Sequence, residues 1–183
     1  MHPITVSNLR NAHGGESMAH MRYKAWGEVA EKEGLPNVAR LFRAISAAET
    51  IHATSHFQVL KNEGGDSLCA SMAVFGVGNS SQNLQGGING ETYEINEMYP
   101  TFLETAKLQG EKGAQLSFFY ALSAEKTHAA LFQKAKDVID STKKDVPLGP
   151  IQICNVCGWT AEGDIPDKCP ICGAKRDQFQ TFA

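Results

Sequence analysis

The sequence of 183 residues is long enough for one medium-sized domain and a small appendage. Its formal net charge of −3 argues against nucleic acid or an anionic membrane surface as a principal partner. No apolar run reaches the roughly 18 residues of a membrane-spanning helix, and the N-terminus lacks the features of a signal peptide, so we expect a cytoplasmic protein.

Helix-like segments can be read along the chain before residue 143. They cover residues 5–33, 36–63, 90–109 and 111–142. The break at Gly34-Leu35-Pro36 combines a helix stop with a proline that a first helical turn tolerates, and Gly110 and Gly113 indicate another short connection. Short connections join antiparallel neighbours, so the first segment should pair with the second and the third with the fourth. Pro100 should bend the third segment or mark a local irregularity.

The connection between the two helical hairpins is long. Residues 64–88 are rich in glycine, serine and asparagine, and a glycine-rich loop at 86–90 is expected to lead into the third helix. One long crossover between two helical hairpins is the ferritin-like topology. The sequence therefore predicts a mainly α protein built on a ferritin-like four-helix bundle.

Two copies of a Glu-x-x-His motif stand at matching distances from another glutamate. Glu49-Thr-Ile-His52 follows Glu16 by 33 residues, and Glu125-Lys-Thr-His128 follows Glu91 by 34 residues. Residues three apart on a helix share a face, so each motif can present both side chains to one metal ion. Two such helices, with one glutamate from each of two others, form the ligand cage of di-iron bundles. Glu94 adds a further carboxylate one turn beyond Glu91.

The surroundings of the motifs indicate that these carboxylates are buried. Phe42 and Ile45 flank the first motif, and Phe118 and Phe132 flank the second. A buried carboxylate without a partner is destabilising by several kcal/mol. Two iron ions would nearly cancel the charge of the five glutamates. A donor set rich in oxygen, with only two imidazoles, favours iron or manganese over zinc or copper.

The C-terminal segment contains four of the five cysteines, in two Cys-x-x-Cys pairs. They are Cys154, Cys157, Cys169 and Cys172. Residues 143–153 read as a linker, so we expect one domain at 1–145 and a second at 146–183. A second domain this small cannot bury a sufficient apolar core, so it needs a cross-link, which thiolate ligation of a metal would supply. The tetrahedral site suits iron or structural zinc, and a di-metal bundle that consumes electrons favours iron.

Other candidates carry weaker signals. Tyr23 and Tyr99 could each donate a hydrogen bond to a ligand carboxylate, or could be ordinary core residues. His20 could approach the metal site but is not expected to be a ligand. We expect His56 at the surface or behind the ligands, and Cys69 as an inert thiol.

Together these motifs resemble the rubrerythrin family, whose members combine a di-iron bundle with a C-terminal rubredoxin-like domain. The resemblance covers nearly the whole chain, and every di-iron ligand position of the family has a matching residue. It rests on Gly15–Ala19, Glu49-x-x-His52, Gly90-Glu91-x-x-Glu94, Glu125-x-x-His128 and the paired cysteine knuckles. The crossover around 66–81 looks longer than the family pattern.

The resemblance implies a role for each ligand. Glu49 and Glu125 would bridge two irons, Glu16 would bind one of them terminally, and Glu91 and His128 would complete the other. A third iron would occupy the four-cysteine site, where zinc is possible in recombinant protein. One iron would be bound by Glu94 when oxidised and by His52 when reduced. We count these two exchanging ligands, together with Tyr23 and Tyr99, as the candidate catalytic residues.

The activity implied by the resemblance is that of a peroxidase reducing hydrogen peroxide to water. Electrons would come from rubredoxin or an NAD(P)H-dependent rubredoxin reductase and pass through the cysteine-bound iron. The chain contains no Gly-x-Gly-x-x-Gly fingerprint, so we do not expect it to bind the nicotinamide itself. The family pattern also implies a homodimer in which one subunit's rubredoxin-like domain serves the partner's di-iron site.

Two other classes of protein share parts of this pattern. A ferroxidase or iron-storage protein of the ferritin type has the same bundle, but storage does not require an internal electron relay. A non-enzymatic metal-binding protein would hold zinc at both sites. The colour of the protein separates these classes, since an oxidised iron tetrathiolate is red and a zinc site is colourless.

Overall fold

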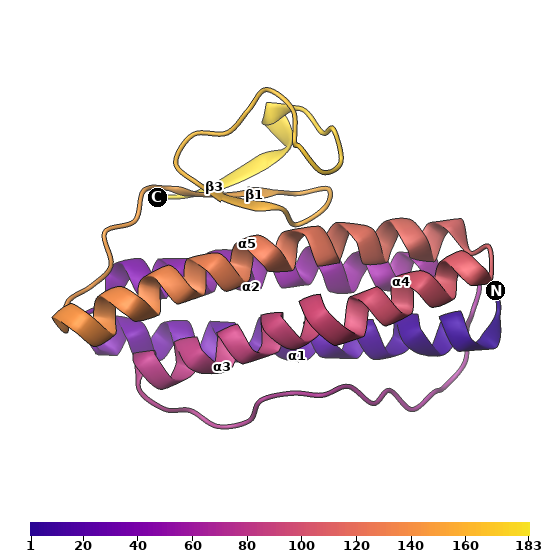
Figure 1. The fold of residues 1–183 in the computed structure, drawn as a ribbon, viewed down its shortest axis with the longest axis horizontal. Helices are drawn as coiled ribbons and strands as arrows, with labels where there is room; N and C mark the ends of the chain where they lie inside the picture. The colour runs from indigo at the N-terminus through magenta and orange to yellow at the C-terminus, as the bar shows by residue number, and fades with distance from the viewer.

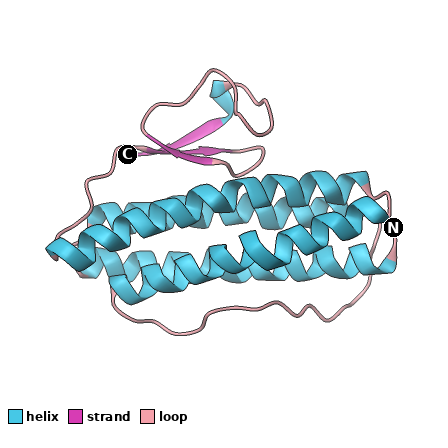
Figure 2. Ribbon diagram, in the orientation of Figure 1, coloured by secondary structure: helices cyan, strands magenta, loops and turns pink.

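The computed structural model describes residues 1–183 and is mainly helical (Figures 1 and 2). Its helices are α1 (Pro3–Lys32), α2 (Pro36–Val59), α3 (Ser80–Tyr93), the π-helix η1 (Glu94–Met98), α4 (Tyr99–Leu108) and α5 (Lys112–Thr142). The C-terminal segment adds β1 (Ile151–Cys154), β2 (Thr160–Glu162), the 3-10 helix η2 (Arg176–Gln178) and β3 (Phe179–Phe182). None of the helices is long and apolar enough to cross a membrane.

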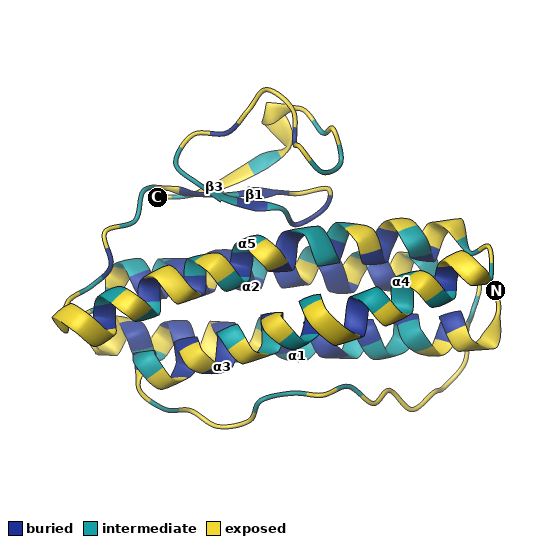
Figure 3. Cartoon of the chain, viewed as in Figure 1, coloured by how far each residue is buried: buried dark blue, intermediate teal, exposed yellow.

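The helices form the predicted bundle with one long crossover. The helix α1 pairs with α2, and the continuous run α3–η1–α4 pairs with α5 (Figure 1). The chain between α2 and α3 returns along the outside of the bundle, and most of it is exposed (Figure 3). The three antiparallel strands lie in the order β2-β1-β3 and stand over α2 and α5. We call residues 151–183 the cysteine module.

The third helix begins at Ser80, earlier than the expected start at residue 90. Asn79 and Gln82 form a reciprocal capping box, with both side chain to backbone distances at 3.0 Å. The glycines that suggested a loop have a packing role instead. A Cβ at Gly86 or Gly87 would lie 2.9 Å from the ring of Trp26 or Phe132, respectively. The helix therefore uses glycine to approach neighbouring aromatic rings.

The irregularity expected at Pro100 is confirmed. The five residues of η1 immediately precede the turn that contains Pro100, whose ring cannot accommodate the regular bonding of a preceding helical turn. A π-helical turn inserted in an α-helix changes the direction of the side chains that follow it. Here it contains Glu94, the carboxylate that the sequence places one turn beyond Glu91.

The segment between α5 and β1 is fastened to the start of α2. The carboxylate of Asp145 accepts hydrogen bonds from the backbone N–H groups of Asn37 and Val38, at 2.7 and 3.2 Å. Both groups belong to the first turn of α2, where the helix itself provides no acceptor. Val146 is fully buried, and β1 contributes two isoleucines to the same apolar core as the bundle. The cysteine module is therefore packed onto the bundle.

The glycine packing of α3 leads to a test of stability. Gly87→Ala is expected to lower the free energy of unfolding by about 1–3 kcal/mol, because the added methyl group would overlap the fully buried Phe132. Gly90→Ala is the matched control, since its Cβ would lie 3.7 Å from the nearest atom outside the helix and alanine favours helix by about 1 kcal/mol. Urea unfolding of both variants measures the difference. Equal stability of the two would contradict the packing role.

Candidate metal centre

The bundle brings six of the seven predicted di-iron ligands together in its interior. They are Glu16 of α1, Glu49 and His52 of α2, Glu91 of α3, and Glu125 and His128 of α5. These side chains are at most 2% exposed. They form two groups of four, and within each group the ligand atoms lie within 4.8 Å of one another.

Glu49 and Glu125 belong to both groups. The carboxylate of Glu49 places Oε2 2.9 Å from Nδ1 of His52 and Oε1 3.3 Å from Nδ1 of His128. The carboxylate of Glu125 is placed in the same way, with Oε1 2.9 Å from Nδ1 of His52 and Oε2 2.7 Å from Nδ1 of His128. Each carboxylate thus offers one oxygen to each group, which is the geometry that a carboxylate bridging two metal ions requires.

Several ligand atoms of these two groups make no hydrogen bond of acceptable geometry, even where a carboxylate oxygen and an imidazole nitrogen lie close together. The buried atoms without one are Oε2 of Glu16, Oε1 of Glu49, Oε2 of Glu91, both carboxylate oxygens of Glu125 and Nδ1 of His128. Nearly all buried polar groups in folded proteins are satisfied, so a cluster of unsatisfied ones needs an explanation. Cations bound between these oxygens and nitrogens would satisfy them, and the donor set fits iron or manganese.

The buried charges shift one another's pKa. Burial raises the pKa of Glu16 and Glu91 well above the usual range, and the neighbouring carboxylates raise it further. Burial also acts to raise the pKa of Glu125, but the charges of the two histidines outweigh it and lower that pKa overall. Burial opposes charge on His52 and His128, yet the carboxylates beside them raise their pKa. Without a cation, Glu16 and Glu91 therefore favour the protonated form, and a bound cation would favour their carboxylates.

Both histidines are held with Nδ1 towards the cage. Nε2 of His52 donates to the carbonyl oxygen of Cys157, at 3.2 Å, and Nε2 of His128 lies 2.8 Å from Oγ1 of Thr160. The Thr160 hydroxyl donates to the carbonyl oxygen of Gly158, so its oxygen accepts from His128. With a proton on Nε2, each ring can bind a metal through Nδ1 once that nitrogen has given up its own proton. The sequence contains no signal that identifies Thr160 in this role.

Both predicted tyrosines donate hydrogen bonds to cage carboxylates. The hydroxyl of Tyr23 lies 2.6 Å from Oε1 of Glu91, and the hydroxyl of Tyr99 donates to Oε1 of Glu16. Burial and the nearby carboxylates raise the pKa of both phenols well above the usual value. They therefore remain protonated and act as donors that fix the orientation of these carboxylates.

Glu94 does not join either group of ligands. Glu94 belongs to η1 and its side chain is buried. Together with Arg22 it lines a pocket of about 300 Å³. Burial, followed by the charge of Glu16, raises the pKa of Glu94 well above the usual range. The structure thus has His52 directed into the cage and Glu94 outside it.

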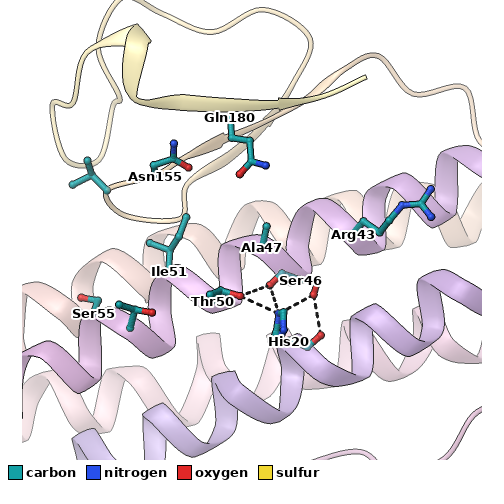
Figure 4. Close-up of a pocket in the computed structure, with 11 residues that line it drawn as sticks. His20, Arg43, Ser46, Ala47, Thr50, Ile51, Ser55, Asn155 and Gln180 are labelled. Carbon is teal, nitrogen blue, oxygen red and sulfur yellow. Dashed lines mark hydrogen bonds between the residues drawn. The ribbon is translucent and has the colours of Figure 1, made fainter.

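The other histidines have different surroundings. Nδ1 of His20 lies 2.9 Å from the carbonyl oxygen of Ser46, and His20 lines a pocket of about 610 Å³ between α2 and the cysteine module (Figure 4). It lies outside both groups of ligands. His56 is not at the surface: it is fully buried behind the ligands, where Nε2 lies 2.9 Å from the hydroxyl of Tyr99. The exposed thiol of Cys69 donates to the carbonyl oxygen of Arg10.

The four C-terminal cysteines form a second cluster. Their sulfurs pair across the module, Cys154 with Cys172 and Cys157 with Cys169, each at 3.6 Å. Gly158 and Gly173 have φ values of +77° and +75°, which lets their N–H groups turn back to the carbonyl oxygens of the first cysteine in each pair. All four sulfurs lie within 4.8 Å of one another, as a tetrahedral metal site requires.

The two candidate metal sites are in direct contact. A Cβ on Gly158 would lie 2.1 Å from Nε2 of His52, so the absence of a side chain permits the close approach. The knuckle that holds Cys157 therefore packs against a histidine of the cage. This contact is made within one chain.

Two family models match the chain. The one described as rubrerythrin matches residues 7–136, and the one described as rubrerythrin, rubredoxin-like domain, matches residues 152–180. This chain belongs to the rubrerythrin family. Membership of the rubrerythrins agrees with the oxygen-rich cage in the bundle and the four-cysteine knuckle of the module.

The relatives extend over nearly the whole chain. Rubrerythrin-2 of Clostridium acetobutylicum is 54% identical over 179 residues, which cover 98% of this chain and 97% of that protein. A structure of nigerythrin in its fully reduced, all-ferrous state has a TM-score of 0.86 at 32% identity, covering 97% of this chain and 86% of nigerythrin. A Rhodobacter capsulatus bacterioferritin has a TM-score of 0.69 at 18% identity, over 77% of this chain and 88% of its own, which shows the ferritin-like fold.

The metal-free rubrerythrin-family chain is expected to lose stability as the pH rises from about 5 to 8. The raised pKa values of Glu16 and Glu91 give a stabilising contribution that is complete below the usual 4.5 and is lost as the pH rises through the folded-state values. His52 and His128 act in the same direction above 6.5. Glu125, with a lowered pKa, keeps its full contribution in this range. Urea unfolding with a chelator measures the trend, and a rise in stability with pH would contradict it.

Proposed function

We propose that this protein is a peroxidase that reduces hydrogen peroxide to water at a di-iron site in the bundle. The observation that carries the proposal is the contact between the two sites, where the carbonyl oxygen of Cys157 lies 3.2 Å from Nε2 of His52. An enzyme that is oxidised in every cycle needs a source of electrons at this place, whereas iron storage does not. Membership of the rubrerythrin family supports the same assignment.

Two ferrous ions bound in the cage would supply the two electrons that cleavage of the O–O bond consumes, and would act as Lewis acids. Glu49 and Glu125 would hold the pair, since each carboxylate directs one oxygen towards each group of ligands. Tyr23 and Tyr99 keep the terminal carboxylates oriented through their hydrogen bonds. Because the ligands are almost fully buried, bulk water is kept from the reaction.

The cysteine module is proposed to return electrons to the cage. The four thiolates would hold an iron ion that could accept or release one electron while its ligands stay in place. The hydrogen bond from His52 to Cys157 supports a short path between the sites. Rubredoxin or an NAD(P)H-dependent rubredoxin reductase is the proposed donor, and four free thiols placed for metal binding support a reducing, cytoplasmic setting.

Ligand exchange at one iron forms part of the proposal. His52 points into the cage while Glu94 lies outside it, which corresponds to the arrangement expected for the reduced state. Glu94 is buried and lies three residues after the ligand Glu91, so it is placed to act as the alternative ligand. Its backbone belongs to the irregular π-helical turn η1. We infer that Glu94 would hold the oxidised iron in place of the imidazole of His52.

The proposed assembly is a homodimer of chains with domains at 1–145 and 146–183. The crossover supports a partner surface, since Leu68 and Phe75 are 98% and 85% exposed. Electron transfer from the partner's module is not required, because the module of the same chain already makes hydrogen bonds to both cage histidines. Exchange of modules between subunits would form the same contacts.

The first test combines metal content with electron flow. Protein from iron-replete cells is expected to contain about three irons per chain and to be red when oxidised. Cys157→Ser should abolish steady-state turnover with a reductase, while the chemically reduced variant still completes one oxidation by peroxide. Cys69→Ser is the control, because Cys69 is exposed and lies outside both sites. Iron mineralisation without peroxide consumption would favour a ferroxidase, and zinc in every site would exclude both enzymes.

The second test separates the exchanging ligands. His52→Ala should retain a diferric site through Glu94 but react slowly with peroxide when reduced. Glu94→Ala should leave the reduced form intact and weaken the oxidised form. Glu97→Ala is the matched control, since Glu97 lies in η1 but is exposed. Crystal structures of oxidised and reduced protein with identical ligands would refute the exchange without refuting the peroxidase.

A further inference from the structure

A row of hydrogen-bonded groups leads from the cage to the surface near the ends of α2 and α5. It begins at Glu16 and continues through Tyr99, His56, Ser117 and Ser55. The first three of these residues are fully buried, Ser117 is 3% exposed, and Ser55 is only half-buried. None of the four beyond Glu16 is a predicted metal ligand.

Each link in the row is short. Tyr99 donates to Oε1 of Glu16, and Nε2 of His56 lies 2.9 Å from the Tyr99 hydroxyl oxygen. On the other side of the ring, Nδ1 of His56 lies 2.8 Å from Oγ of Ser117. Oγ of Ser117 in turn lies 2.7 Å from Oγ of Ser55. Proton transfer between such groups needs distances in this range.

The donors in the row all point the same way. Since the Tyr99 proton is directed at Glu16, the phenol oxygen must accept from Nε2–H of His56. Burial, followed by the charge of His52, lowers the pKa of His56 to about 3, so the ring is neutral and its Nδ1 accepts from Ser117. Ser117 then accepts from Ser55. Every proton is placed for movement towards the cage.

The outer end of the row opens to solvent. Ser55 and Ser117 both line a surface pocket of about 480 Å³, and Ser55 also borders the pocket between α2 and the cysteine module (Figure 4). The inner part is enclosed by aromatic rings, with Phe118 5.4 Å from the ring of His56. A network that served only packing would need neither a uniform donor direction nor an opening at its far end.

We propose that Ser55, Ser117, His56 and Tyr99 form a proton relay that carries protons from the surface to the Glu16 side of the cage. The inference rests on the proposed function, because reduction of hydrogen peroxide by two electrons consumes two protons and gives two waters. Two ferrous ions in the cage would supply the electrons, and solvent would supply the protons.

One passage moves one proton and leaves the charge of every residue in the row unchanged. A hydronium ion in the solvent protonates Ser55 as the hydroxyl proton of Ser55 passes to Ser117. His56 then receives a proton from Ser117 at Nδ1 as it releases one from Nε2. Tyr99 takes up that proton as its own passes along the hydrogen bond with Glu16 to the peroxide oxygen being reduced, so Glu16 remains a carboxylate. Rotation of the hydroxyl groups and return of His56 to its Nε2–H form reset the row for the second proton.

The resting direction of the relay can be measured without turnover. In full-length protein loaded with zinc, nitrogen NMR of His56 at neutral pH is expected to show a neutral ring with its proton on Nε2. A ring protonated on Nδ1, or a charged ring, would overturn the relay because the row would no longer be continuous. Zinc keeps the protein diamagnetic and the cage charge balanced.

The kinetic test uses two variants of similar volume. Ser117→Val removes the hydroxyl group and fills the space a water could use, and it should slow oxidation of the reduced protein by peroxide at least about tenfold. Ser117→Thr retains the hydroxyl group and should restore the rate. Ser46→Ala is the control, because Ser46 is also a buried serine but bonds to His20 outside the row. Iron content is measured in all of them.

The outcomes separate the relay from the function on which it rests. Equal rates for wild type and Ser117→Val, with equal iron content, would overturn the relay and leave the peroxidase assignment intact. Wild-type reduced protein that does not react with peroxide would overturn the proposed function, and the relay with it. A slow valine variant, a restored threonine variant and an unaffected Ser46→Ala would support the relay.

Discussion

The carboxylates buried inside the four helices are the constraint on which the rest of the structure depends. Glutamates in an apolar interior repel one another, and each lacks the water that would otherwise solvate it. Glu49 and Glu125 avoid part of this penalty because, in each carboxylate, one oxygen lies near His52 and the other near His128. The remaining unsatisfied atoms require cations. Bundle, ligands and metal therefore have to be considered as one electrostatic unit.

The cysteine module takes part in that unit. Its backbone and Thr160 fix the outer nitrogen of each cage histidine, which sets the tautomer that binds metal on the inner side. A residue with any side chain at position 158 would push His52 and the knuckle apart. The geometry of one metal site is thus partly determined by the fold of the other.

Sequence spacing was sufficient to predict the bundle, its long crossover and the residues that gather in the cage. Spacing works for these because a helix places residues three apart on one face, so a local pattern implies a local geometry. It failed for Gly86 and Gly87, whose role depends on aromatic rings from distant helices. It also left the position of His56 open between the surface and the interior, since its partners Tyr99 and Ser117 lie on other elements. The position of Glu94 outside the cage depends on a π-helical turn, which no spacing rule indicates.

The hydrogen bonds of Asp145 have a consequence for how the molecule unfolds. This residue precedes the cysteine module yet caps the first turn of α2, and Val146 beside it lies in the bundle core. Release of the module would uncap a bundle helix and expose apolar surface, so detachment and melting are linked. The bundle and the cysteine module should therefore unfold together, and heating should give a single thermal transition.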